Sequence, residues 1–135
     1  MKNILIATDF SHHSKYTLEY VLNFLEKTPD PCHILLLNTY LVTETDEEKI
    51  VDINDVLKKK SKESLQEELE RARALTRNPN INIEISSQLG TVKNVMWKLL
   101  QKEKFDLVAM GKDGGKHVET VAGVLKEYEC PLLIT

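Results

Sequence analysis

The sequence predicts a doubly wound, Rossmann-like α/β fold, in which a five-stranded parallel sheet carries helices on both faces. Two observations predict it. Short apolar runs alternate along the chain with longer segments whose apolar residues recur every three to four positions. The inner runs are apolar without alternation, which is typical of strands buried on both faces of a parallel sheet. The 135 residues fit a single domain over 1–135.

The first half of the chain supplies two strands and two helices. Residues 2–8 and 32–40 form apolar runs that predict buried strands. Ser11 is a candidate N-cap for the helix between them, and Pro29 stops that helix. A second, longer helix is expected over 50–75, with Glu67–Arg71 and Glu70–Arg73 as favourable pairs on its surface.

The second half continues the alternation. Residues 81–85 alternate between isoleucine and polar residues, which predicts an edge strand with one wet face. Gly90 ends that strand, and Thr91 can cap the next helix. Residues 105–114 form an apolar run that ends in a G-x-x-G turn. A last helix precedes a final strand at 131–135.

Right-handed crossovers give the strand order 3-2-1-4-5, with the half-wet third strand outermost. Strands 1 and 4 are then neighbours at the switch point, where ligands bind in open α/β sheets. Asp9 and Gly111 are expected side by side there, at the carboxyl ends of these two strands.

The composition argues against several classes of function. A net charge of −3 predicts no general attraction to nucleic acid or to a membrane surface. The sequence contains no long apolar run of the kind that forms a signal peptide or a membrane span, so a cytoplasmic location is expected. Cys32 and Cys130 fall on strands too far apart for a disulfide, and no metal-ligand spacing is present. His12, His13 and His117 are interpreted as surface residues.

Several motifs, taken in order, resemble the universal stress protein family. They are ILIATDFS at the first strand, Leu89-Gly90-Thr91 before a helix, DLVAMGKDG at the fourth strand, and CPLLI at the last. The resemblance spans the whole chain. It implies a HUP/Rossmann-like fold, a cytoplasmic location, frequent homodimers, and either an ATP-binding or a non-binding branch.

The glycine signature of the ATP-binding branch is only half present. Gly111 and Gly114 match its first part, but Val124 stands where the next glycine is expected, and Gly123 lies one place short. Alignment from the CPLLI motif instead puts Glu119 near that position, where its charge would repel a triphosphate. A weaker or smaller anion remains an alternative ligand.

The resemblance implies a candidate nucleotide site made by Asp9, Tyr40, Met110, Gly111, Gly114 and Gly115. Structural interpretations stand beside it. Asp9 can be a turn residue that accepts main-chain N–H groups, and the glycines can serve a strand-to-helix turn that needs positive φ.

We therefore expect a non-catalytic stress-response or regulatory module with a degenerate nucleotide site and no required cofactor. The alternative is an ATP- or AMP-binding member that acts as a nucleotide sensor. No nucleophile paired with a base is visible, and a phosphoacceptor domain would need clustered acids beside Asp9. The apolar strand at 131–135 is expected at a sheet edge, where pairing with a second copy would give a homodimer; protein partners are expected but unnamed.

Overall fold

The computed structural model describes residues 2–41, 47–112 and 115–135. All five strands are parallel and follow the order β3-β2-β1-β4-β5, so the predicted fold class and strand order are confirmed. The elements are β1 (Lys2–Ala7), α1 (His12–Leu25), β2 (Cys32–Tyr40), α2 (Glu47–Leu75), β3 (Ile81–Leu89), α3 (Val92–Lys102), β4 (Leu107–Met110), α4 (Gly115–Glu127) and β5 (Leu132–Ile134).

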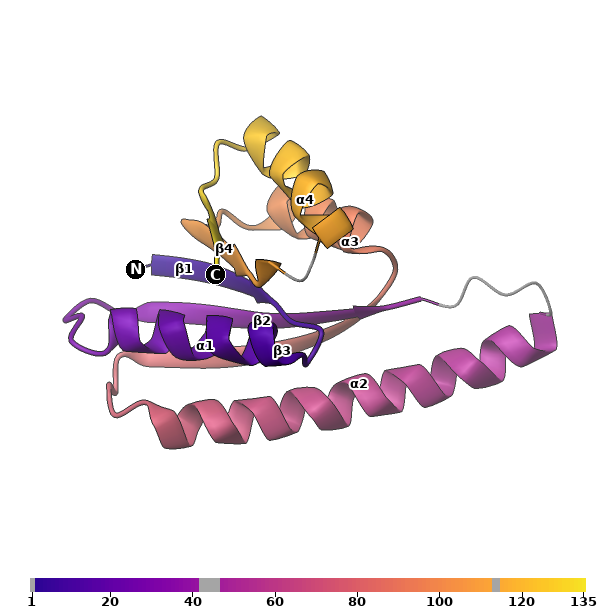
Figure 1. Cartoon of the computed structure of the whole chain (residues 1–135), viewed down its shortest axis with the longest axis horizontal. Coiled ribbons are helices and arrows are strands. Elements are labelled where there is room, and N and C mark those ends of the chain that lie inside the picture. Colours follow the sequence, from indigo (N-terminus) through magenta and orange to yellow (C-terminus); the bar gives the residue numbers. More distant parts are fainter. Residues whose placement is uncertain (1, 42–46, 113–114) are drawn as a thin grey trace.

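Two hydrophobic layers hold the helices on the sheet. Figure 1 shows α3 and α4 together at the top, α1 in front of β2 and β3, and α2 beneath them; the two core clusters place α1 and α2 on one face and α3 and α4 on the other. Alternate residues of the buried strands enter opposite layers, as a two-residue period requires. Ile34 and Leu36 of β2 pack toward α1 and α2, whereas Leu35 and Leu37 pack toward α3 and α4.

The predicted caps are in place. The Ser14 N–H donates to the Ser11 hydroxyl over 3.2 Å at the start of α1. The Asn94 N–H donates to the Thr91 hydroxyl over 3.2 Å at the start of α3. Each side chain satisfies a main-chain donor that the first helical turn leaves unpaired. The caps therefore fix where both helices begin, next to the carboxyl ends of the strands that precede them.

Arg71 of α2 has different partners from the one that helical spacing suggested. Its guanidinium donates to Glu68 over 3.0 Å and to Glu19 of α1 over 2.6 Å, rather than to Glu67. Arg71 faces α1, where the Glu68 side chain is nearly buried. The tertiary contact thus selects the partner, and the three charges join α1 to α2.

The chain ends beside the loop that follows β4. The Thr135 N–H donates to the Met110 carbonyl, and the Lys112 N–H donates to the Thr135 carbonyl, each over 3.2 Å. The Thr135 and Thr17 hydroxyls lie 2.6 Å apart, which ties this end of β5 to α1. β5 forms one edge of the sheet, as predicted.

Cys32 and Cys130 are both free thiols, in agreement with the strand-spacing argument. Burial raises the pKa of each thiol above its usual value of 9.0, so both are protonated at neutral pH. None of the helices in the described ranges is long and apolar enough to cross a membrane.

Candidate functional site

A cavity of about 300 Å³ opens at the carboxyl ends of β1, β2 and β4. This is the switch point of the sheet, where α1 after β1 and α4 after β4 leave on opposite faces. Its volume is at the lower end of the range for small-molecule sites. The cavity is lined by Ala7, Thr8, Asp9, Ser14, Leu37, Asn38, Thr39, Val92, Met110, Gly111 and His117.

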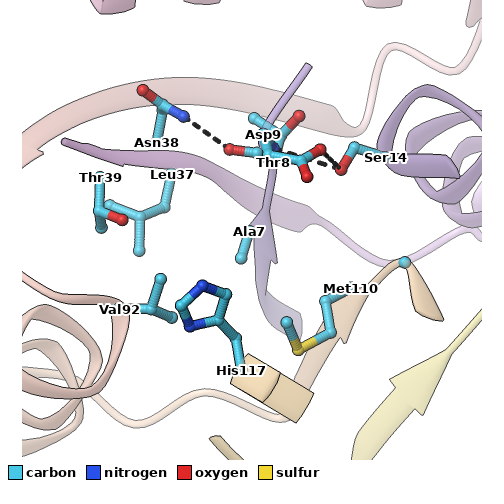
Figure 2. A pocket seen from close by; sticks show the side chains of 11 residues that line it. Ala7, Thr8, Asp9, Ser14, Leu37, Asn38, Thr39, Val92, Met110 and His117 are labelled. Atoms are coloured by element: carbon cyan, nitrogen blue, oxygen red, sulfur yellow. Dashed lines mark hydrogen bonds between the residues drawn. The ribbon is translucent and has the colours of Figure 1, made fainter. Parts of the chain in front are cut away.

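Asp9 lies at the α1 side of this cavity (Figure 2). Its Oδ1 accepts hydrogen bonds from the Ser14 hydroxyl over 2.6 Å and from the Ser11 N–H over 3.0 Å. Partial burial by itself raises the pKa of the Asp9 carboxyl, but the bonds from Ser11 and Ser14 together hold it below its usual value of 3.8. Asp9 therefore accepts hydrogen bonds that stabilise the turn, as the structural interpretation proposed. Its carboxylate also lines the cavity.

The turn after Asp9 has an unusual backbone. Phe10 has a φ of 65°, a left-handed conformation that bulky residues seldom adopt. Its N–H donates to the Thr8 hydroxyl over 3.1 Å, and its side chain packs against the core below α1. Strain of this kind gathers at functional sites, where the surrounding contacts over-determine the backbone.

A buried chain of polar side chains supports the same turn from behind. The Asn38 amide donates to the Thr8 carbonyl over 2.7 Å and accepts from the Ser61 hydroxyl of α2 over 2.6 Å. The Ser87 hydroxyl of β3 donates to Ser61 over 2.7 Å. The chain thus joins α2 and β3 to the wall of the cavity and satisfies both ends of Asn38.

Gly111 lies in the cavity wall, where β4 comes close to α1. A Cβ at this position would lie 3.1 Å from both the carbonyl carbon and the Cβ of His13. Gly111 does not have positive φ; of the glycines described, Gly90 has it, at 140°. The turn therefore needs glycine at 111 for its size, and the expectation of positive φ at 111 is wrong.

Of the other predicted site residues, some line the cavity and others do not. Met110 lines it, and Gly115 is the first residue of α4. Gly114 lies outside the described residues. Tyr40 closes β2 just beyond the cavity, and Thr39 takes its place in the wall.

The predicted nucleotide site did not include His117, a lining residue that bears on the choice of ligand. His117 stands in the first turn of α4 and points into the space near Thr39, Val92 and Met110 (Figure 2). Histidine spacing did not indicate this residue, because His117 belongs to no sequence motif. The signal that could have found it is the short connection from Gly111 to α4, which places the first turn of that helix beside the cavity.

The charge of the cavity is the property that most restricts its ligand. Among the lining residues whose side chains the structure describes, which leave out positions 115 and 116, Asp9 is acidic, His117 carries an imidazole, and none is lysine or arginine. Lys112, which follows Gly111, lines a separate shallow depression with His13 and Tyr16. No cluster of three metal-ligating side chains occurs within the described ranges.

The whole chain, residues 1–135, matches the model of the universal stress protein family. The chain belongs to the universal stress protein family. This match confirms the resemblance seen in the sequence motifs. No curated protein matches the sequence at a significant level.

Solved universal stress proteins share the fold at low sequence identity. The protein UspA from Lactobacillus plantarum is 17% identical, with a TM-score of 0.75 over 98% of this chain and 96% of its own. A family member from Arabidopsis thaliana with AMP bound is 19% identical, with a TM-score of 0.69 over 99% and 90%. One from Archaeoglobus fulgidus in complex with dAMP is 13% identical, with a TM-score of 0.60 over 99% and 97%.

Proposed function

We propose that this universal stress protein is a non-catalytic regulatory module that binds a nucleoside monophosphate in the switch-point cavity. The observation that carries the proposal is the charge of that cavity: one carboxylate, one imidazole, and no lysine or arginine among its described lining residues. Family members with AMP and dAMP bound support the ligand class.

A monophosphate suits this cavity better than a triphosphate does. The three phosphates of ATP would bring several negative charges close to the Asp9 carboxylate, which stays ionised at neutral pH. A single phosphate can use the main-chain N–H groups at the start of α4, together with His117. The apolar walls formed by Leu37, Val92 and Met110 suit a base.

The same geometry supports a binding role without chemistry. Asp9 is held by Ser11 and Ser14, and a carboxyl with a lowered pKa is a poor proton acceptor at neutral pH. In the described part of the wall, no hydroxyl or thiol is paired with a histidine base. The ligand would then act by stabilising one state of the protein.

Isothermal titration with AMP, and with ATP and Mg²⁺, tests the ligand class on protein freed of carried-over nucleotide. We expect AMP to bind at least about ten times more tightly than ATP, a difference of about 1.4 kcal/mol. Val92→Trp fills the cavity and should abolish AMP binding. Leu89→Trp is the matched control, because Leu89 is exposed and outside the cavity.

Equal or tighter binding of ATP would contradict the monophosphate proposal and favour the ATP-sensor alternative. Absence of binding by either nucleotide at millimolar concentration would contradict a nucleotide role altogether. Hydrolysis of ATP that Val92→Trp removes would contradict the non-catalytic part.

We further propose that the module is a homodimer paired through β5. Pro131 and Thr135 use their main-chain groups toward β4, so by alternation Leu132 and Ile134 direct theirs to the free edge. If a two-fold axis passes beside Leu133, Leu132 of one copy pairs with Ile134 of the other, and Ile134 of the first copy pairs with Leu132 of the second. Four main-chain hydrogen bonds result.

This register predicts a specific cross-link. Two Leu133 residues would face each other as a non-hydrogen-bonded pair, with Cα atoms about 4.5 Å apart, within disulfide reach. In a Cys130→Ser background, Leu133→Cys should give a covalent dimer under mild oxidation. Ile134→Cys is the control and should cross-link much less, because its partner in this register is Leu132. Equal cross-linking of both variants, or of neither, would contradict the register.

A further inference from the structure

We propose that an exposed aromatic stripe on α1 forms the second half of this two-fold interface, facing the same stripe of another copy. The stripe consists of Tyr16, Tyr20 and Phe24, which are 55%, 44% and 69% exposed. The proposal rests on the β5 pairing proposed above, and its experiment separates the two. The Tyr16 and Tyr20 ring centroids lie 6.3 Å apart, so the stripe is continuous at this end.

The stripe lies on the flank of α1 that faces β5. Residues four apart share a flank of a helix, which places the three aromatic residues in one row. The opposite flank meets α2, where Glu19 accepts from Arg71. On the β5 side, Thr17 contacts Thr135, and Tyr16 shares a shallow depression with Thr135. The row therefore runs alongside the edge strand.

The dimer geometry leaves a trough that this row would fill. α1 lies over β1 and β4. With strands about 4.8 Å apart, two α1 helices related by the β5 axis lie roughly 19 Å apart. Helices in direct contact lie about 8–10 Å apart, so side chains must bridge the space above the paired strands. Large rings reaching in from both helices can do so, over a floor made by Leu133 of each copy.

The area required for a stable dimer points to the same row. A three-residue edge strand alone offers few side-chain contacts. A standard interface buries about 800 Å² on each partner. The three rings expose roughly 300 Å² together, since aromatic side chains each present about 150–250 Å². They would thus supply more than a third of one side of the interface.

A second copy is the occupant that the symmetry favours. A two-fold axis brings the same patch of both subunits together, so an interface patch must be complementary to itself. An uncharged aromatic row meets this condition, since tilted and edge-to-face ring pairs are favourable in either direction. The free edge of β5, which borders the row, has the same symmetry requirement.

Sedimentation velocity over a concentration series tests the proposal on the full chain. We expect Tyr20→Ser with Phe24→Ser to weaken dimerisation at least about tenfold, as loss of buried aromatic anchors does. Trp97→Ser is the matched control. Trp97 is 44% exposed on α3, which covers the other face of the sheet. Ile134→Pro removes one outward N–H from β5 and tests the strand pairing independently.

Hydroxyl-radical footprinting adds a readout that needs no substitution. Oxidation of Tyr20 and Phe24 should fall several-fold as the protein concentration rises through the dimer range, while oxidation of Trp97 stays constant. An unchanged dimer in the double variant, together with loss of the dimer in Ile134→Pro, would overturn the stripe and leave the strand pairing standing. A monomer at all concentrations would overturn both.

Discussion

Gly111 shows how one residue can hold the cavity in shape through its size. Gly111 follows β4, and a Cβ at this position would lie 3.1 Å from the main-chain carbonyl carbon of His13 in α1. Family resemblance marks this glycine as a ligand contact, and the structure gives it a packing role that exists without any ligand. The two roles make different predictions for substitution.

We expect Gly111→Ala to lower the free energy of unfolding by about 1–3 kcal/mol, as overpacking does in a well-packed region. Gly123→Ala is the matched control. Nothing lies within 4 Å of its added Cβ, and in the middle of α4 alanine should stabilise the helix by about 0.5–1 kcal/mol. Urea denaturation of both variants measures the difference. An unchanged stability in Gly111→Ala would show that α1 moves away easily.

Tyr40 and Thr39 show the limit of sequence reasoning at the scale of a residue. The strand was predicted with correct bounds, and the family places a base near its end. The cavity lies at the end of this strand, so the position at which the strand leaves the wall decides which side chains line it. Leu37, Asn38 and Thr39 all line the cavity and Tyr40 does not, so the strand leaves the cavity wall one residue before the position that the resemblance implied.

At the scale of elements, periodicity predicted all nine elements in their order, and the caps at Ser11 and Thr91 fixed two helix starts. Local patterns suffice here, because a helix or strand must bury one face whatever its neighbours are. The partner of Arg71 could not be predicted in this way. The choice between Glu67, Glu68 and Glu19 depends on how α1 packs against α2.

The start of α4 is the element boundary on which the site depends most. Because the helix begins at Gly115, its first turn brings His117 to the cavity. The broken glycine signature did not indicate which residue would lie there. A histidine in the first turn is a side-chain donor for a single phosphate, which is why the proposed ligand is smaller than ATP.

At the scale of the whole molecule, the buried chain formed by Ser87, Ser61 and Asn38 connects both outer elements of one half to the cavity. It runs from the edge strand β3 through α2 to β2 and ends on the Thr8 carbonyl. Asn38 and Ser61 are 8% and 4% exposed, so water cannot replace a lost partner freely. The position of α2 is thereby coupled to the turn that carries Asp9.

We expect Ser61→Ala to destabilise the protein by about 1–3 kcal/mol, because it leaves the buried Asn38 oxygen without its donor. Ser87→Ala is the control: Ser87 is only partly buried and ends the chain, so its loss should cost about 1 kcal/mol or less. Thermal and urea unfolding measure both. Amide exchange in Ser61→Ala should also rise at Thr8, whose N–H donates to Leu37 beside the released Asn38. Equal losses of stability in the two variants, with unchanged exchange at Thr8, would contradict a coupling that runs through Asn38.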